Sequence, residues 1–244
     1  MSLSAPLGLV VALVVIPLLV QPRNPVDPAE FHGILSWMWR FNQIYCSAVH
    51  RLKTGRAPLP GIGPAILIAN HTCNIDHFLL QAGTRRKLGF MIAKEYYDFP
   101  LFNPICRMIG CIPVNRDGKD LAAIRAALRV LEQGGVVPMF PEGTIIPKSG
   151  EEIGQGKHGV AFLAIRAKVR VIPAYIRGTP RSIKFLRSLF TPSRAEVIYG
   201  PAIEPSEFVH PGDSTSERAF LTATTDRFMA AIRSIRDANP PARR

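Results

Sequence analysis

Residues 68–80, IANHTCNIDHFLL, hold four side chains that could do chemistry: His71, Cys73, Asp76 and His77. Their donor atoms suit a metal ion, and the thiol could act as a nucleophile. The first histidine and the aspartate could instead form a proton-transfer pair. A polar turn that caps the next helix would also contain such residues. The stretch alone fits all four interpretations.

The four interpretations make different demands on the rest of the chain. A metal site needs ligands that converge, yet His71 and His77 follow a strand and enter a helix, and no second ligand cluster stands out. A nucleophilic Cys73 needs a base and an orienting group that point at it. The pair needs only His71 and Asp76: the carboxylate fixes the tautomer, and the other imidazole nitrogen takes a proton from a substrate hydroxyl. Because His-x4-Asp spacing often arises by chance, the alternatives stay open here.

Two further polar turns follow apolar, strand-like runs. Arg116 lies in GCIPVNRD, after a strand-like run, and its planar guanidinium can bind a phosphate with two parallel hydrogen bonds. Glu142, Gly143 and Thr144 form a turn in FPEGT. Ligands of open α/β sheets bind beyond the carboxyl ends of the strands. We therefore expect these turns to gather with residues 71–77 at one edge of a sheet.

The elements that must position these turns alternate along the chain. The strand candidates are 65–70, 87–93, 111–115, 136–140, 169–176 and 195–200. The helix candidates are 31–53, 117–135, 157–168 and 216–238. This alternation predicts an α/β fold with a mixed, largely parallel sheet flanked by helices. Pro173 predicts that its strand is an edge or a bulge, and Asp117 is the expected cap of the helix that follows it.

The N-terminal region predicts attachment to a membrane. Residues 5–20 are apolar and uncharged, without the positive start of a secretory signal, which indicates a retained anchor. The proline-rich segment 21–28 is typical of a linker. The amphipathic helix over 31–53 could lie at the membrane interface or pack on the catalytic core. We expect membrane-anchoring helices and a linker over 1–58 and a catalytic domain over 59–244, facing the cytoplasm because basic residues follow the anchor.

Composition limits the partners. The formal net charge is +12 and the hydrophobic fraction is 47%, which fits a globular protein that contacts an anionic surface. No nucleic-acid-binding motif is present, so lipid or a phosphorylated substrate is favoured. The four cysteines form no CxxC pair, as in a reduced, intracellular protein. Residues 177–194 hold five basic residues and no acidic one; they could contact anionic lipid, bind a donor's phosphates or form a solvated basic helix.

Four blocks in order resemble the glycerolipid acyltransferases, the family that includes lysophosphatidic acid acyltransferase. The first block is NHTCNID with His71 and Asp76, and the second is GCIPVNRD with Arg116. The third is FPEGT with Glu142, and the fourth is VIPAY with Pro173. The resemblance covers residues 60–200. One block is weak support, whereas four at plausible spacing are strong support for an acyltransferase.

The resemblance implies a reaction and its participants. The donor would be an acyl thioester of coenzyme A or acyl carrier protein, and the acceptor a lysophospholipid hydroxyl, as in 1-acylglycerol 3-phosphate. His71 would be the general base and Asp76 its orienting partner, with no covalent enzyme intermediate. Arg116 and the turn Glu142, Gly143 and Thr144 would bind the acceptor's phosphate and glycerol, with Lys157 and Pro173 as further substrate-binding candidates. The resemblance implies no metal and no cofactor, and partners among membrane lipids.

One position departs from the family pattern. The third block usually continues with an arginine, and here Ile145 follows Thr144. Lys148 or Lys157 could supply the missing charge, although a flexible ammonium is not a guanidinium. The alternatives are therefore another acceptor, such as glycerol 3-phosphate, an amino-lipid or a glycolipid, or a non-catalytic, membrane-docked lipid-binding protein. The sequence gives no indication of the oligomeric state.

Overall fold

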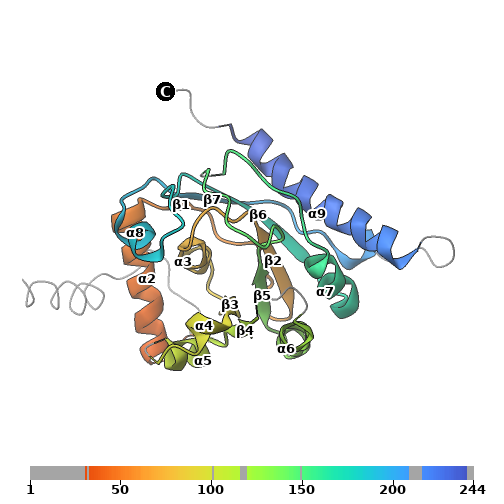
Figure 1. Ribbon diagram of the computed structural model, residues 1–244, viewed down its shortest axis with the longest axis horizontal. Coiled ribbons are helices and arrows are strands. Elements are labelled where there is room, and N and C mark those ends of the chain that lie inside the picture. Colours follow the sequence, from red (N-terminus) through yellow and green to blue (C-terminus); the bar gives the residue numbers. More distant parts are fainter. Residues whose placement is uncertain are drawn as a thin grey trace, which may run out of the picture.

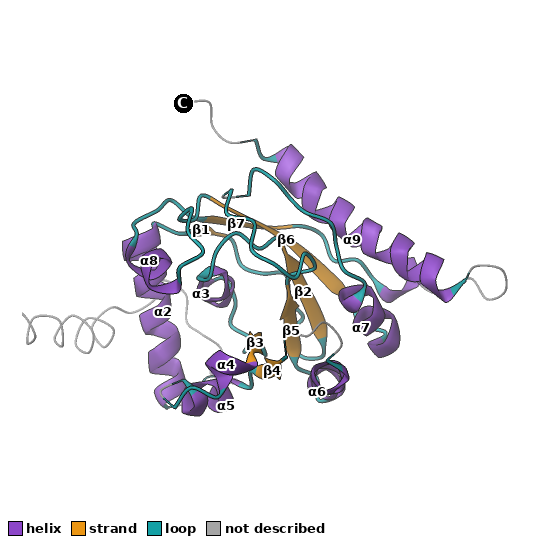
Figure 2. Ribbon diagram, viewed as in Figure 1, coloured by secondary structure: helices purple, strands orange, loops and turns teal. Residues whose placement is uncertain are grey.

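A five-stranded sheet forms the centre of the molecule. The computed structural model describes residues 31, 33–100, 102–115, 120–148, 150–208 and 216–240. In sheet order the strands are β1 (Lys53–Thr54), β7 (Glu196–Tyr199), β6 (Val171–Arg177), β2 (Ala65–Ala69) and β5 (Val136–Met139). Only the β6–β7 pair is antiparallel, and the other neighbouring pairs are parallel. The predicted α/β fold with a mixed, largely parallel sheet is confirmed (Figure 2).

Helices cover both faces of this sheet. They are α2 (Ile34–His50), α3 (Asp76–Ala82), α6 (Leu121–Glu132), α7 (Gly159–Ala167), α8 (Phe185–Phe190) and α9 (Glu217–Ala238), with a 3-10 turn at Pro205–Phe208. Helices α6, α7 and α9 lie on one side, and α2, α3 and α8 on the other (Figure 1). Alternate residues of β2 enter the two cores: Ile66 and Ile68 face the first, and Leu67 the second. All of β2 is buried, as expected for a strand covered on both faces.

Two of the predicted strands pair with each other instead of joining the main sheet. These are β3 (Met91–Ala93) and β4 (Ile112–Val114), which are parallel. Between them lie two short helices, α4 (Lys94–Tyr97) and α5 (Asn103–Ile109). A single bridge between Leu88 and Val136 links this region to β5.

Two sequence predictions about local structure need correction. Pro173 lies in β6, an interior strand, so the edge alternative is wrong. The bulge alternative fits, because the antiparallel pairing shifts by one residue beside Pro173, between Ala174↔Tyr199 and Val171↔Ile203. The cap of α6 is Asp120, which accepts from Ala123 N, and not Asp117.

Helix α2 packs on the body of the protein. Trp39 Nε1 donates to Thr84 O at 2.9 Å, and Asn42 Nδ2 donates to Phe78 O at 2.9 Å. These contacts support the packing interpretation of the predicted helix 31–53. The predicted anchor 5–20 and linker 21–28 lie outside the described residues, and the predicted boundary at residue 58 stays a prediction. Within the described ranges, no helix combines the length and apolar content needed to cross a bilayer.

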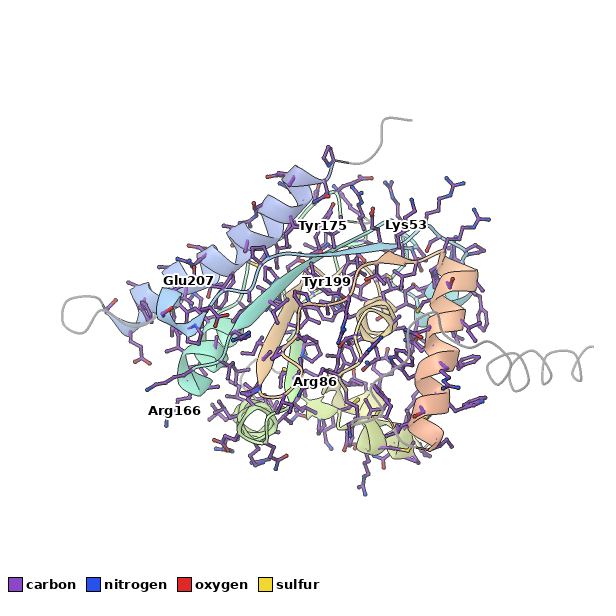
Figure 3. All side chains as sticks on the ribbon, turned by 180° about the vertical axis from the view of Figure 1, so that it is seen from behind. Lys53, Arg86, Arg166, Tyr175, Tyr199 and Glu207 are labelled. Atoms are coloured by element: carbon purple, nitrogen blue, oxygen red, sulfur yellow. The ribbon has the colours of Figure 1, made fainter. Side chains whose placement is uncertain are left out.

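The amino ends of the neighbouring strands β2 and β5 are tied together away from the predicted site. Arg86, labelled in Figure 3, donates to the carbonyls of Pro60 and Gly63, which precede β2, and of Gly134, which precedes β5. The polar turns of the predicted site lie at the opposite edge of the sheet, at the carboxyl ends of these strands.

Candidate active site

The site begins where β2 ends. Asn70 follows the strand, and its side chain forms two hydrogen bonds to Ile176 in β6: Nδ2 donates to the carbonyl at 2.8 Å, and Oδ1 accepts from the amide at 2.7 Å. This buried amide ties the carboxyl ends of the two strands together. It fixes the backbone from which His71 projects.

His71 and Asp76 meet as predicted. The imidazole Nδ1 lies 2.8 Å from Asp76 Oδ2. Because a carboxylate only accepts hydrogen bonds, Nδ1 must carry the proton, and Nε2 keeps its lone pair. Asp76 is the first residue of α3, where a helix N-terminus favours negative charge. The Asp76 side chain is fully buried, whereas 13% of the His71 side chain is exposed. The histidine therefore reaches the surface and the aspartate does not.

The turn supplies every other partner of the Asp76 carboxylate. Oδ2 accepts from the amides of Thr72 at 2.6 Å and Cys73 at 3.0 Å. Oδ1 accepts from Thr72 Oγ1 at 2.8 Å and lies 3.4 Å from Cys73 Sγ. Thr179 Oγ1, which follows β6, donates to Thr72 Oγ1 at 2.8 Å. A buried charge is tolerated when its lone pairs are used in this way, so these bonds also hold the carboxylate in one orientation.

Aromatic rings pack against the His71 imidazole and fix the orientation of its plane. Phe140, at the end of β5, stacks on the His71 ring at 4.0 Å with an interplanar angle of 11°. His77 meets the His71 ring edge-on at 5.8 Å and packs against Phe90 at 4.9 Å. Burial, and next the neighbouring His71, lower the pKa of His77 to about 4. His77 is therefore neutral near pH 7 and adds no second positive charge beside the base.

The FPEGT turn brackets the backbone of His71. Glu142 is 4% exposed; its Oε1 accepts from His71 N at 2.9 Å, and its Oε2 accepts from Gly154 N at 2.8 Å. Ile146 N donates to His71 O at 2.8 Å, so both backbone polar groups of the histidine bind this turn. Burial raises the pKa of Glu142. The two carboxylate oxygens thus already have backbone partners, and the geometry gives Glu142 a positioning role.

Gly143 and Thr144 remain exposed at the tip of this turn. Gly143 has a φ of +64°, and a Cβ there would lie 2.7 Å from Lys157 Nζ. The exposed Lys157 therefore lies over the turn, held by its amide, which donates to Pro141 O at 2.7 Å. Lys148, the other candidate cation, forms an ion pair with Glu152.

The structure describes only one of the two remaining predicted site residues. Arg116 lies outside the described residues, which stop at Asn115 after β4 and resume at Asp120. Pro173 is buried inside β6 and is paired with Ile68, three residues before His71. Its position within the sheet gives no support to the predicted contact with substrate.

Sequence reasoning missed several residues that hold the base. Phe140 and Asn70 stood inside the quoted blocks, and an aromatic or amide beside a strand end is the signal that could have found them. Thr72 was also inside a block, but its bond to Thr179 joins positions that are 107 residues apart. No local spacing reveals such a contact. Cys73 is fully buried and His77 lies in the first turn of α3, so both are neighbours of the pair.

Comparisons with known proteins agree on the family. A family model described as Acyltransferase matches residues 50–177. The 1-acyl-sn-glycerol-3-phosphate acyltransferase of Bacillus subtilis is 25% identical over 153 residues, or 62% of this chain and 73% of that protein. The protein of the same name from Streptococcus pneumoniae is 29% identical over 154 residues, which span 62% of this chain and only 54% of that protein. The crystal structure of the 1-acyl-sn-glycerophosphate (LPA) acyltransferase PlsC from Thermotoga maritima shares the fold, with a TM-score of 0.66, 18% identity, and coverage of 98% of this chain and 95% of that one.

Proposed function

Because this chain belongs to the acyltransferase family, we propose that it moves a fatty acyl group from an acyl thioester to the free hydroxyl of 1-acylglycerol 3-phosphate in phospholipid synthesis. The names of the Bacillus and Streptococcus relatives favour this acceptor. The observation that carries the proposal is the His71–Asp76 pair at 2.8 Å, with Nδ1 engaged and Nε2 left as the base.

The proposed reaction is a direct transfer. Nε2 of His71 takes the proton from the acceptor hydroxyl as that oxygen attacks the thioester carbonyl carbon. The C–O bond forms, the C–S bond breaks, and the proton passes from the imidazolium to the thiolate that leaves. Asp76 stabilises the imidazolium between these steps, because its carboxylate is held at Nδ1. No side chain of the protein is acylated.

Acceptor binding is proposed for Arg116 and Lys157. Arg116 would grip the acceptor phosphate with two parallel hydrogen bonds. Lys157, which lies over Gly143, would supply the second charge that an arginine at position 145 would otherwise provide. The exposed Gly143 and Thr144 would contact the glycerol. Glu142 would act indirectly, by holding the backbone of His71.

We further propose that the protein is membrane-bound through residues 1–58, with the catalytic domain 59–244 facing the cytoplasm. The donor would be acyl-CoA or acyl carrier protein, and no metal or cofactor would take part. The apolar segment 5–20 and the net charge of +12 support this arrangement.

A panel of acceptors tests the proposal. The purified full chain is incubated with acyl-CoA or acyl carrier protein thioester and with 1-acylglycerol 3-phosphate, glycerol 3-phosphate, an amino-lipid or a glycolipid. We expect preferential acylation of 1-acylglycerol 3-phosphate, and a higher KM for it in Arg116→Ala and Lys157→Ala. Because Ile145 removes a charge, the second candidate is an acceptor without a phosphate. Turnover of such an acceptor alone would refute the role of Arg116, and binding without any turnover would refute the enzyme.

A further inference from the structure

One surface beside the site exposes large apolar side chains. Ile183, Leu186 and Phe190 are 65%, 67% and 73% exposed. Leu186 and Phe190 are four residues apart and share one side of α8, and Ile183 lies in the turn before the helix. The opposite side is anchored, since Ser188 is fully buried and Leu189 packs on the core. We call these three residues, together with Lys184, Arg187 and Arg194, the docking surface.

The same surface is positively charged. Lys184, Arg187 and Arg194 are exposed, and residues 178–194 contain no acidic residue. The neighbouring Arg181 and Arg177 pair with Glu151 and Glu196. In the described part of the chain, by contrast, no ion pair involves the three cations of the docking surface. They are available to an anionic partner.

Hydrogen bonds join the docking surface to the loop that holds the base. Asn74, between His71 and Asp76, donates from Nδ2 to Ile183 O at 2.5 Å. On the other side, Tyr45 of α2 donates its hydroxyl to Leu189 O at 2.8 Å. Helices α8 and α2 accordingly lie together at one end of the molecule, beside α3 (Figure 1). A partner seated on α8 would therefore contact the segment that is bonded to the loop between His71 and Asp76.

We infer that the docking surface rests on an anionic lipid bilayer, with Leu186 and Phe190 among the acyl chains and the three cations at the lipid phosphates. Protruding apolar side chains ringed by cations match the boundary between headgroups and acyl chains better than they match a folded acidic protein. The inference rests on the proposed function in that a lipid acceptor must reach His71 from a bilayer. It assigns a contact separate from the N-terminal segment, on the catalytic body itself.

A probe placed on the docking surface tests this contact locally. The full chain with Leu186→Cys is labelled with an environment-sensitive fluorophore; the four native cysteines are all buried, so the label is selective. Leu121→Cys on α6, which is 63% exposed, is the matched control. With phosphatidylglycerol vesicles we expect a blue shift and quenching by brominated lipid at position 186 only. No response there, or an equal response at position 121, would overturn the inference.

Charge reversal tests the cations in the same assay. We expect Lys184→Glu with Arg187→Glu to raise the anionic lipid needed for half of the probe response by at least about 25-fold, or about fivefold for each cation. The double variant Arg125→Glu with Arg129→Glu, exposed on α6, makes the same change in net charge and should leave the response nearly intact. Equal effects of the two pairs would mean that only total charge matters, which contradicts a specific surface.

Two further measurements separate this inference from the proposed function. Acyl transfer to a short-chain lysolipid below its critical micelle concentration should be unchanged by the Lys184 and Arg187 substitutions, because that acceptor needs no bilayer. Probe insertion without turnover of any lysolipid would reject the proposed function and leave the docking surface standing. If soluble acyl carrier protein shifts the probe and vesicles do not, the surface is a protein interface and the inference fails.

Discussion

At the scale of single residues, the site depends on how firmly one carboxylate is held. Asp76 is fully buried and accepts from the His71 ring, from two backbone amides and from the Thr72 hydroxyl. The contact of the aspartate with His71 could be predicted from the His-x4-Asp spacing together with the later blocks. The donors that fix it could not, because the Thr179 contact depends on tertiary structure.

Asp76→Asn should retain the shape of the site and lose its chemistry. An amide can present its NH2 group to Nδ1, which selects the wrong imidazole tautomer. We expect kcat for acyl transfer to fall by about 10³- to 10⁴-fold, with a small change in KM. Steady-state kinetics provides the measurement, and circular dichroism shows whether the variant is folded. A kcat near that of the wild type would contradict the orienting role.

Thr72→Val removes the hydroxyl that binds Asp76 Oδ1 and leaves the backbone amide in place. Leaving that oxygen and the Thr179 hydroxyl without this partner should cost about 1–3 kcal/mol in the free energy of unfolding. We expect kcat to fall about tenfold through misplacement of His71. Thr72→Ser should restore both values. If serine restores stability and not kcat, the hydroxyl has no part in orienting the base.

His77 should make the protein sensitive to mild acid. Its folded pKa is about 4, below the ordinary 6.5, so the unfolded chain binds the proton more tightly between these values. The free energy of unfolding should therefore fall as the pH drops from about 6.5 to about 4, by at most about 3 kcal/mol. Urea unfolding of the wild type and of His77→Phe at pH 7 and pH 4.5 measures the difference. Equal losses in both proteins would show that His77 is not the titrating group.

At the scale of elements, the FPEGT turn holds the backbone of His71 from both sides. The turn after β5 binds both the amide and the carbonyl of His71, through Glu142 Oε1 and Ile146 N. The sequence placed this turn at the correct edge of the sheet because parallel strands end together. It did not reveal that the carboxylate faces backbone amides, since the spacing of FPEGT carries no information on side-chain direction.

Glu142→Gln tests this contact with the His71 backbone by using a side chain of the same shape. One amide oxygen can still accept, but the NH2 group must face either His71 N–H or Gly154 N–H and leave a donor unsatisfied. We expect a loss of about 1–3 kcal/mol in the free energy of unfolding, together with a lower kcat. Thermal unfolding and single-turnover kinetics on the same preparation are the measurements. A stable variant with unchanged KM for the acceptor and unchanged kcat would argue against a positioning role.

The elements also show where local pattern reading fails. The rule that proline marks an edge strand or a bulge failed in its first half at Pro173, because β6 is an interior strand and the antiparallel register shifts by one residue beside the proline. The runs 87–93 and 111–115 were read correctly as strands, but their pairing in a separate small sheet depends on α4 and α5 between them. Alternation along the chain does not specify partners.

At the scale of the whole molecule, the amino ends and the carboxyl ends of the strands hold different groups. Arg86 ties the amino ends of β2 and β5, whereas the carboxyl ends gather His71, Asp76 and the FPEGT turn. The docking surface lies beside the second group, joined to it by Asn74. We therefore propose that a bilayer acceptor approaches along α8 and meets the exposed part of the His71 ring.

The proposed general-base role of His71 is tested most directly by the single-turnover rate of acyl transfer to 1-acylglycerol 3-phosphate. This rate is measured for the wild type and for His71→Ala. The purified proteins must be free of host acyltransferases, and His77→Ala serves as the control for loss of a neighbouring imidazole. If His71 is the general base, its loss should reduce the rate by at least about 10³-fold, while His77→Ala stays within about tenfold of the wild type. Turnover by His71→Ala at a rate close to that of the wild type would contradict the role of His71 as the general base.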